Sequence, residues 1–373
     1  MSTKHILPFF IVLSAALPLC AAPPSISAEG TVYLLTERDP LFLSRNAVYL
    51  SVAYDKGRTR LVRPVLPYGD LPADLRAALK PVSMGDVLNA PAGTFMKAEE
   101  DPLVRELVSR VNPRNISAWA ERLAITGKRS ASALDQSPAS GNRLAADMIA
   151  DELGRLGYAV ERHCYRTRKK DNECNVAGRR EGEKYILVAA HFDTVGHENA
   201  GADDNASGTA ALLEMARVLA DYRSDTGLIF LAANGEEIGV AGSYAYAKKL
   251  RAAGELSRVA WAINMDMIAY NKSGVIELET NREFAQHAEW VAALARVYTR
   301  MTPHIAMPAW GSDHVPFLEA GIPAYLSIQH WDNRNPCYHR PCDTMQGLDW
   351  DFAADIARLN LAVIAGKSRL TPD

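Results

Sequence analysis

The sequence has 373 residues, of which 48% are hydrophobic and 23% charged, and its formal net charge is −3 at pH 7. This composition is that of a globular protein with a sizeable core, and the length suits one large domain plus an accessory segment. The sequence contains no long basic or acidic block. Because phosphate binding needs a concentrated basic patch, nucleic acid is not expected as a partner.

Residues 1–28 have the pattern of an export signal. Lys4 precedes an apolar stretch at 6–19, which is shorter than the roughly 20 residues that span a bilayer. Small residues follow within 21–28, as a signal peptidase requires, although the cleavage point stays open. A lipid anchor at Cys20 is disfavoured because bulky Leu19 precedes it. We therefore expect a periplasmic or secreted protein with no membrane span.

Residues 29–111 differ from the rest of the chain. The runs 31–37 (TVYLLTE) and 46–54 (NAVYLSVAY) are typical of strands, and 67–82 (PYGDLPADLRAALKPV) is typical of a loop that leads into a short helix. No candidate catalytic cluster occurs in this sequence. It is expected to be an accessory or pro-region, or alternatively an N-terminal decoration of the main domain.

From residue 112 to 373, strand and helix patterns alternate. A helix is expected at 140–156, with Ser140 as N-cap and Gly157 as its stop. Its apolar face is expected to consist of Leu144, Met148, Ile149 and Leu153. The further expected elements are strands 158–164, 174–180 and 184–191, helix 206–222, strand 227–234, helix 242–252, strand 258–267, helix 282–300, strand 323–329 and helix 349–368.

This alternation predicts an α/β fold, namely a three-layer αβα sandwich with a central, mostly parallel mixed sheet, plus a small N-terminal accessory segment. Acidic and histidine residues repeatedly follow the C-terminal ends of the apolar strands, the edge at which open α/β sheets bind their ligands.

Four cysteines follow the export signal, and an even count in an oxidising compartment favours two disulfide bonds. Proximity in sequence favours the pairs Cys164–Cys174 and Cys337–Cys342, although three pairings are possible. A structural zinc held by all four thiolates is the alternative. The spacings lack the C-x2-C pairs that such sites commonly have.

The candidate site residues include imidazoles and carboxylates, which together suit a pair of zinc ions. His191 ends a buried strand, and Asp193 is placed to accept the other ring N–H. Asp203 lies in the loop GADDNASG, which opens a helix. Adjacent acids Glu236 and Glu237 point in different directions, so that one can bind metal while the other contacts the attacking water.

Two later segments complete this set. Asp266 follows the apolar strand of RVAWAINMDM, and His339 lies in the loop NPCYHRPCDT. Two zinc ions in such a site would lower the pKa of a shared water and polarise a carbonyl, which is the chemistry that amide hydrolysis needs.

Six motifs in order carry a family resemblance: H-x-D, GADDNASG, GEE, NMDM, SDH-x-PF and YH-x-x-x-DT. Over residues 112–373 the chain resembles the co-catalytic zinc aminopeptidases of metallopeptidase family twenty-eight. The arrangement CYH-x-x-CD is similar in particular to the secreted bacterial aminopeptidases of leucyl type, in which a disulfide braces this loop. The resemblance implies an exported enzyme that hydrolyses N-terminal peptide bonds of peptides or proteins.

The resemblance also implies a role for each matching residue. His191 and Asp266 would hold one zinc, Glu237 and His339 the other, and Asp203 would bridge the two. Glu236 would be the general base, and Tyr338 would stabilise the oxyanion. The Asp203–Asp204 peptide is expected to be cis. Arg340 departs from the family, which often has threonine after the ligand histidine.

The remaining histidines are expected to have other roles. Ser312, Asp313 and His314 are placed on the pocket wall. Four further histidines are interpreted as structural or surface residues: His197, His287, His304 and His330. Alternatives to an aminopeptidase are a zinc carboxypeptidase, a glutaminyl cyclase-like enzyme of the same fold or a non-catalytic binding module. The oligomeric state stays open.

Overall fold

A computed structural model of the protein describes residues 32–36, 46–56, 59–82, 98–131, 140–166, 173–196 and 199–372. The expected export signal at 1–28 lies outside these ranges, as does His197. Among the residues described, no helix is long and apolar enough to cross a membrane.

The N-terminal part contains an antiparallel sheet with its own hydrophobic cluster. Its strands are β1 (Val32–Thr36), β2 (Leu50–Lys56), β3 (Thr59–Pro64) and β4 (Leu79–Val82), in the order β2-β3-β1-β4. Helix α2 (Ala73–Ala78) lies between β3 and β4 in sequence. The cluster consists of Leu35, Leu50, Val62, Leu71, Leu75 and Leu79. The strands expected at 31–37 and 46–54 correspond to β1 and β2, whereas strands β3 and β4 were not expected.

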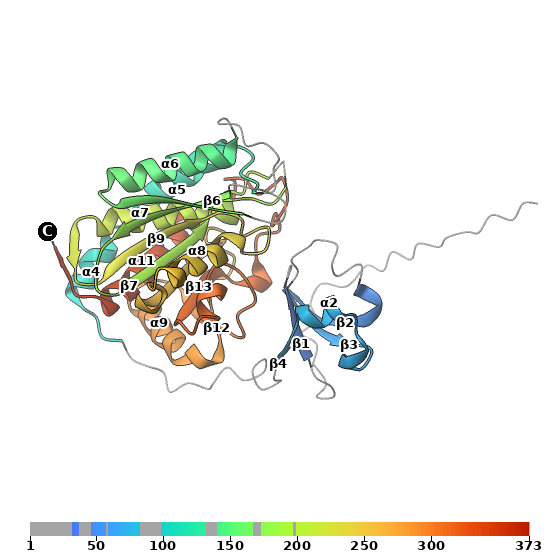
Figure 1. Ribbon diagram of the computed structural model, residues 1–373. Helices are drawn as coiled ribbons and strands as arrows, with labels where there is room; N and C mark the ends of the chain where they lie inside the picture. The colour runs from blue at the N-terminus through green and yellow to red at the C-terminus, as the bar shows by residue number, and fades with distance from the viewer. Residues whose placement is uncertain are drawn as a thin grey trace, which may run out of the picture. The chain divides into compact units, whose positions relative to one another are not determined.

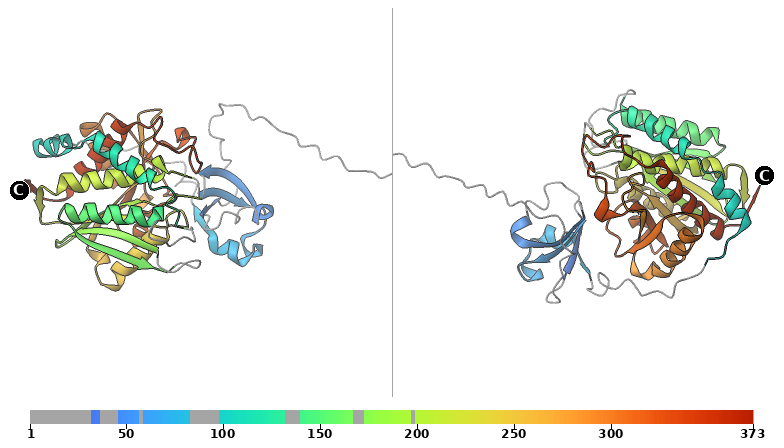
Figure 2. Two further views of the ribbon diagram at one scale, coloured as in Figure 1. Left: turned by 90° about the horizontal axis from the view of Figure 1, so that it is seen from above. Right: turned by 180° about the vertical axis from the view of Figure 1, so that it is seen from behind.

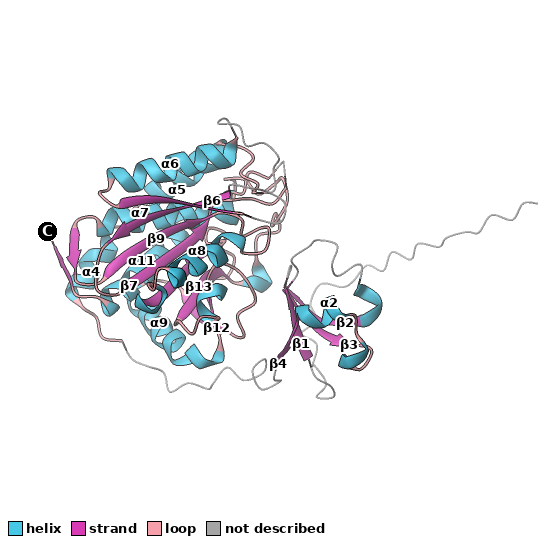
Figure 3. Ribbon diagram, in the orientation of Figure 1, coloured by secondary structure: helices cyan, strands magenta, loops and turns pink. Residues whose placement is uncertain are grey.

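The main sheet has eight strands in the order β12-β11-β13-β10-β7-β9-β6-β5 (Figures 1 and 3). Their bounds are β5 (Ala159–Tyr165), β6 (Glu173–Arg180), β7 (Tyr185–His191), β9 (Gly227–Ala233), β10 (Val259–Met265), β11 (Val275–Glu279), β12 (Thr302–Ala306) and β13 (Ala324–Gln329). Strands β13, β10, β7 and β9 are mutually parallel, while β6 and β11 run antiparallel to their inner neighbours. The predicted mixed α/β sheet is therefore confirmed.

Helices cover both faces of this sheet (Figures 1 and 2). Their bounds are α4 (Pro102–Ser109), α5 (Pro113–Ile125), α6 (Gly141–Arg155), α7 (Gly208–Leu219), α8 (Ala241–Ala252), α9 (Ala285–Tyr298), α10 (Val315–Leu318) and α11 (Trp350–Lys367). A small two-stranded sheet pairs β8 (Tyr222–Ser224) with β14 (Leu370–Pro372).

The alternation of side chains along β7 builds the two layers of the core. Ile186, Val188 and Ala190 pack in a cluster with residues of α6, α7 and α11. Leu187 and Ala189 join a second cluster with α8 and α10. Successive side chains of a strand point to opposite faces, so a strand covered on both faces is apolar throughout. This explains why β7 and β9 are continuous apolar runs that end in polar residues.

Helix α6 begins as expected, but the face that it buries agrees only in part with the expected one. The Ser140 side chain accepts a hydrogen bond from Arg143 N, and Gly157 has a φ of 84° just after the helix. Leu144, however, is 39% exposed, so its place on the expected apolar face is wrong, whereas Ile149 and Leu153 are buried as expected. The buried residues are Ala145, Ala146, Ile149, Ala150 and Leu153. Small alanines let the helix approach the sheet closely, and the leucine beside them faces outward.

Candidate metal centre

The first candidate group lies where two neighbouring parallel strands end. His191 is the last residue of β7, and Asp266 directly follows β10. The Nε2 atom of His191 lies 3.3 Å from Asp266 Oδ1 and 3.4 Å from Asp204 Oδ1. His191 is fully buried, and its backbone carbonyl accepts a hydrogen bond from Thr209 Oγ1 at 2.8 Å.

The second candidate group shares Asp204 with the first. His339 Nε2 lies 3.2 Å from Asp204 Oδ2 and 3.2 Å from Glu237 Oε2. In each group the three ligand atoms lie within 4.8 Å of one another. The two oxygens of one carboxylate thus face two different imidazoles, which is the arrangement of a bridging ligand.

Asp203, expected as the bridging residue, lies outside both groups. Its Oδ1 accepts a hydrogen bond from Ala269 N at 2.9 Å, and its Oδ2 accepts one from Asn335 Nδ2 at 3.2 Å. The cis peptide bond is Asp204–Asn205, not Asp203–Asp204 as expected. The expected bridging residue and the expected cis peptide bond are therefore both one residue too early in the sequence. Adjacent acids in a loop point in different directions, and the motif alone does not decide which of the two faces the site.

Asp343 holds the loop that carries Asp204. Its two carboxylate oxygens accept hydrogen bonds from the backbone N–H groups of Asp203 and Asp204, both at 3.0 Å. Burial and the nearby Asp204 raise the pKa of Asp343 to about 6. Although Asp343 ends the YH-x-x-x-D motif, its role was not identified from the sequence.

The start of helix α7 leaves no room for a side chain at Gly208. A Cβ atom there would lie 2.4 Å from Asn205 Oδ1 and 2.5 Å from the carbonyl oxygen of Met265. Asn205 Oδ1 accepts a hydrogen bond from Gly208 N at 2.9 Å, and Asn205 Nδ2 donates one to that Met265 carbonyl at 2.9 Å. The glycine in the DDNASG sequence therefore lets the loop approach the end of β10.

Arg129 is a buried cation that sequence reasoning missed. Its guanidinium donates to the carbonyl oxygens of Phe192, Leu123, Ala200 and Gly201 at 2.7 to 2.8 Å. Burial lowers its pKa to about 10, while the negative charges of Asp343, Asp193 and Asp204 act in the opposite direction. It therefore stays charged at neutral pH and offsets part of the negative charge. It lies in no motif, so the sequence held no signal for it.

Asp193 positions the turn that carries the paired glutamates. Its carboxylate accepts hydrogen bonds from Glu236 N at 3.1 Å and Glu237 N at 3.2 Å. The atom of Asp193 nearest to His191 Nδ1 is its backbone oxygen, at 3.1 Å, whereas carboxylate Oδ1 lies at 3.5 Å. Asp193 thus links the imidazole to the glutamate turn, a wider role than the one expected for it.

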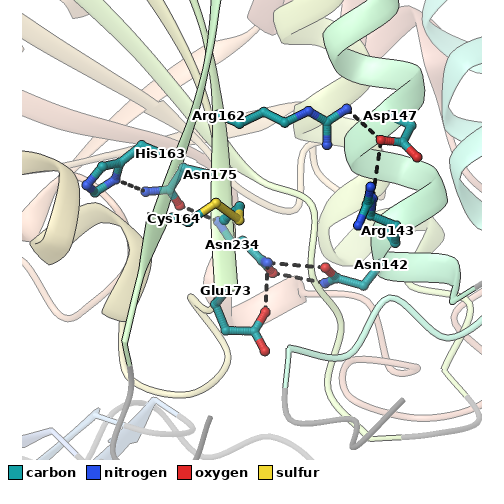
Figure 4. The surroundings of a disulfide bond; sticks show 10 residues. Asn142, Arg143, Asp147, Arg162, His163, Cys164, Glu173, Asn175 and Asn234 are labelled. Atoms are coloured by element: carbon teal, nitrogen blue, oxygen red, sulfur yellow. Dashed lines mark hydrogen bonds and ion pairs between the residues drawn. A yellow bond between two sulfur atoms is a disulfide. The ribbon is translucent and has the colours of Figure 1, made fainter. Parts of the chain in front are cut away.

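The strand before this turn is anchored by a polar network beside the Cys164–Cys174 disulfide (Figure 4). Asn234 follows β9 and exchanges hydrogen bonds with the Asn142 side chain at 2.9 and 3.1 Å. Asn234 Nδ2 also donates to Glu173 Oε2 at 3.0 Å. Both expected disulfides are present, the second being Cys337–Cys342.

Tyr338 packs directly against the candidate ligand His339. Their ring centroids are 3.7 Å apart, and the Trp331 ring packs nearly perpendicular to the tyrosine ring with its centroid 5.5 Å away. Burial raises the pKa of Tyr338 well above its usual range, and so do the carboxylates of Asp204, Glu237, Glu236 and Asp266. The phenol therefore stays protonated at neutral pH and can donate a hydrogen bond.

The segment 312–314 contacts the first group through Ser312. Ser312 Oγ donates to Asp266 Oδ2 at 2.8 Å and accepts from Asn264 Nδ2 at 2.8 Å. Asp313 accepts a hydrogen bond from Ser243, and burial raises its pKa to about 7. His314 Nε2 lies 3.6 Å from Glu279 Oε1. All three residues are buried behind the candidate ligands.

The charges of the two groups fit divalent cations. Three carboxylates, Asp204, Glu237 and Asp266, converge on two imidazoles, and burying such carboxylates without compensation costs free energy. Burial lowers the pKa of His339, but Glu237 and Asp204 outweigh it and raise the value to about 10. Two divalent ions would replace the protons on the two imidazoles and would balance the negative charges of the carboxylates. Imidazole nitrogen and carboxylate oxygen are ligands that zinc accepts.

Comparisons with known proteins agree on one family. Residues 175–364 match the model of peptidase family M28. Aminopeptidase YwaD of Bacillus subtilis is 35% identical over 44% of this chain, and the match spans 36% of that protein. A probable zinc metalloprotease of Leptosphaeria maculans is 26% identical over 70% of this chain and 75% of its own length.

Two solved structures share the fold. LapB of Legionella pneumophila superposes with a TM-score of 0.66 at 18% identity, covering 90% of this chain and 98% of LapB. A glutaminyl cyclase of Bacteroides thetaiotaomicron superposes with a TM-score of 0.58 at 18% identity, covering 68% of this chain and 98% of the cyclase.

Proposed function

Because the chain belongs to peptidase family M28, we propose that it is an exported aminopeptidase that hydrolyses N-terminal peptide bonds with a water activated by two zinc ions. The observation that carries the proposal is the position of Asp204, whose two carboxylate oxygens face the imidazoles of two separate groups. The names of the relatives, an aminopeptidase and a probable zinc metalloprotease, support the same activity and metal.

Each zinc ion would have its own ligands and share the bridge. His191 and Asp266 would hold one ion, and Glu237 and His339 the other. Asp204 replaces Asp203 as the bridging residue. When bound, the ions lower the pKa of a water and polarise a carbonyl oxygen. Asp193, Asp343 and Arg129 hold the ligand-bearing loops in place.

Two further side chains would act on the substrate itself. Glu236 would accept a proton from the attacking water and pass it to the leaving amine. The Asp193 carboxylate fixes the backbone of Glu236, which supports this role. Tyr338 would donate a hydrogen bond to the substrate carbonyl oxygen as negative charge develops on it. The charges of Glu236 and Asp266 would favour the ammonium group of a peptide N-terminus.

A glutaminyl cyclase-like activity is the second candidate, because a solved cyclase shares the fold. The presence of two metal-binding groups that share a carboxylate favours the two-zinc peptidase. A carboxypeptidase would act at the opposite end of a peptide. A non-catalytic binding module is disfavoured because the candidate ligands and Glu236 are all present.

The test is cleavage of leucyl and other aminoacyl anilides, and of free and N-acetylated peptides, before and after chelation. We expect chelator to abolish cleavage, zinc to restore it, and acetylation to block it. The variant Glu236→Gln should lose roughly 100-fold or more in kcat while keeping its zinc. Cleavage that persists after complete metal removal would rule out the zinc mechanism, and cleavage of acetylated peptides would rule out an aminopeptidase.

Export and an accessory role for residues 29–111 belong to the same proposal. Two disulfides are consistent with an oxidising compartment, which supports export. Fractionation of cells and N-terminal sequencing of the mature protein would test it. A mature chain that retains residues 1–28 in a reducing compartment would contradict export. Comparing activity before and after removal of residues 29–97 would test a pro-region, because Val104, Leu107 and Val108 of α4 belong to the main hydrophobic core and must stay.

A further inference from the structure

A third cluster of metal-ligating side chains lies outside the centre described above. Glu277, His304 and His330 each offer one ligand atom, and these atoms lie within 4.8 Å of one another. From the sequence, both histidines are expected to be structural or surface residues. We propose that this cluster is an additional binding site for a divalent transition-metal ion of the zinc class. The proposal does not rest on the peptidase function.

The strand register brings two of the three ligands together. Strands β11 and β12 are parallel neighbours in which Glu277 pairs with His304, so their side chains lie on the same face of the sheet. The His304 Nδ1 and Glu277 Oε2 atoms are 3.7 Å apart. Glu277 is 4% exposed and the His304 side chain 55%, so the site has a buried carboxylate on one side and solvent access on the other.

The third ligand comes from the end of the adjacent strand. β13 pairs antiparallel with β11, and His330 directly follows its last residue. The rings of His304 and His330 are 5.6 Å apart and nearly perpendicular, at 72°. Three strands thus contribute one ligand each, and none of the three ligands belongs to the other two groups.

Neighbouring groups contact two of these ligands. Trp331 N donates to Glu277 Oε2 at 3.4 Å, and Asn333 Nδ2 lies 3.1 Å from His330 Nδ1. A side-chain amide can present either its oxygen or its nitrogen after a half turn. Its oxygen can therefore accept from Nδ1–H, which leaves Nε2 of His330 for a metal ion.

The donor set indicates the class of ion. Two imidazoles and one carboxylate suit zinc, copper or nickel, whereas calcium and magnesium prefer oxygen ligands only. Zinc binds such three-residue sets with water in the remaining position. An ion here would tie β11, β12 and the end of β13 together, next to Trp331, whose ring contacts Tyr338.

The test compares zinc stoichiometry between variants of the full-length protein without a histidine tag. Chelated protein is dialysed against stepwise higher free Zn2+, and bound zinc is measured by mass spectrometry. We expect His304→Ala, His330→Ala and Glu277→Gln each to bind one ion fewer per chain than the parent protein. The matched control His287→Gln should bind as many ions as the parent, because His287 belongs to none of the three clusters.

The difference between parent and variant does not depend on how many ions the other two groups hold. Circular dichroism and anilide cleavage would verify that the His304→Ala variant is folded. Both should match the parent protein, because His304 is exposed and remote in sequence from the candidate catalytic groups. We also expect added zinc to raise the Tm of the parent more than that of His304→Ala. Equal zinc stoichiometry in the parent and all three variants would overturn the third site.

Discussion

Asp203 and Asp204 are adjacent carboxylates in opposite environments. Asp204 accepts contacts from two imidazoles, and although burial raises its pKa, His191 and His339 outweigh it and hold the pKa well below its usual range. Asp203 faces Ala269 N and Asn335, and burial and the nearby Asp343 raise its pKa to about 8. One residue is therefore suited to bind cations, and the other to hold the loop.

This contrast predicts different effects for two isosteric substitutions. Asp204→Asn should lose zinc at both sites and reduce kcat/KM by more than about 100-fold, because it removes a ligand that both sites share. Asp203→Asn should keep both ions and lose about 1–3 kcal/mol of stability, because its amide N–H would face one of the two donors, Ala269 N or Asn335 Nδ2, that the carboxylate accepts from. Metal analysis and thermal unfolding of the two variants provide the measurement. Retention of both ions by Asp204→Asn would contradict the assignment.

Tyr338 offers a second test at the level of one atom. Tyr338→Phe removes the hydroxyl but keeps the ring that stacks on His339. We expect kcat to fall by about 100-fold with little change in KM, because the hydrogen bond would strengthen only as charge develops on the oxygen. Steady-state kinetics with a leucyl anilide would measure this. An unchanged kcat would assign Tyr338 a packing role only.

At this scale, the sequence predicted four members of the two candidate metal-binding groups, namely His191, Glu237, Asp266 and His339, because each follows a strand or lies in a distinctive motif. It failed between Asp203 and Asp204 because spacing along a loop does not fix the direction of a side chain. It also missed Arg129, since a buried cation bound by backbone carbonyls leaves no pattern of side chains in the sequence.

The loop that carries Tyr338 and His339 is held by several contacts at the scale of an element. The Cys337–Cys342 disulfide encloses both residues, and Asn335 Oδ1 accepts a hydrogen bond from Cys337 N at 2.9 Å. His339 has a φ of 58°, a left-handed conformation that residues with a side chain rarely adopt. The loop thus holds its histidine in a conformation that the free chain would disfavour.

Removing this disulfide should weaken zinc binding more than it weakens the fold. In the double variant Cys337→Ser and Cys342→Ser, we expect zinc affinity at the His339 site to fall roughly 10-fold, because the ligand must be ordered on binding. Competition with a fluorescent chelator would measure it. The matched control replaces Cys164 and Cys174, which join β5 to β6. Equal zinc affinities in the two double variants would contradict a specific role for the loop.

The elements that the sequence predicted well are those with long, uninterrupted apolar patterns. β7, β9 and β13 were recognised because strands covered on both faces are apolar throughout. Strands β11 and β12 were missed, since glutamates and an exposed histidine interrupt their apolar residues. Helices α4 and α5 were also missed, although Asp101 and Asn112 cap them and a proline follows each cap.

For the whole molecule, the buried charges predict how stability changes with pH when metal is absent. The pKa of His339 is raised to about 10 and that of Asp203 to about 8, so the folded protein binds more protons than the unfolded chain at neutral pH. The stabilisation that these protons provide is complete at pH values below the pKa that each group has in the unfolded chain. It is lost as the pH rises through the pKa that the group has in the folded protein.

We therefore expect the Tm of chelated protein to be lower at about pH 9 than at about pH 6.5. Zinc should raise the Tm more at the higher pH, because it no longer competes with protons for its ligands. Thermal unfolding monitored by circular dichroism, with and without zinc at each pH, would measure both effects. A Tm of the chelated protein that rises over this range would contradict the proposed charge balance.

The sequence predicted the layered architecture because the strand and helix periodicities alternate along the chain. It could not predict the strand order, since pairings such as β11 with β13 depend on contacts between distant segments. The Glu277, His304 and His330 cluster is a product of that order. Its three residues lie in no common motif and meet only because the strands are neighbours.

The most direct test of the central claim is anomalous scattering from crystals of the zinc-loaded enzyme, recorded on both sides of the zinc absorption edge. Within the candidate metal centre, the account predicts two strong peaks, one beside His191 and Asp266 and one beside Glu237 and His339, with Asp204 contacting both. A single peak in this region, or two peaks bridged by Asp203, would contradict it.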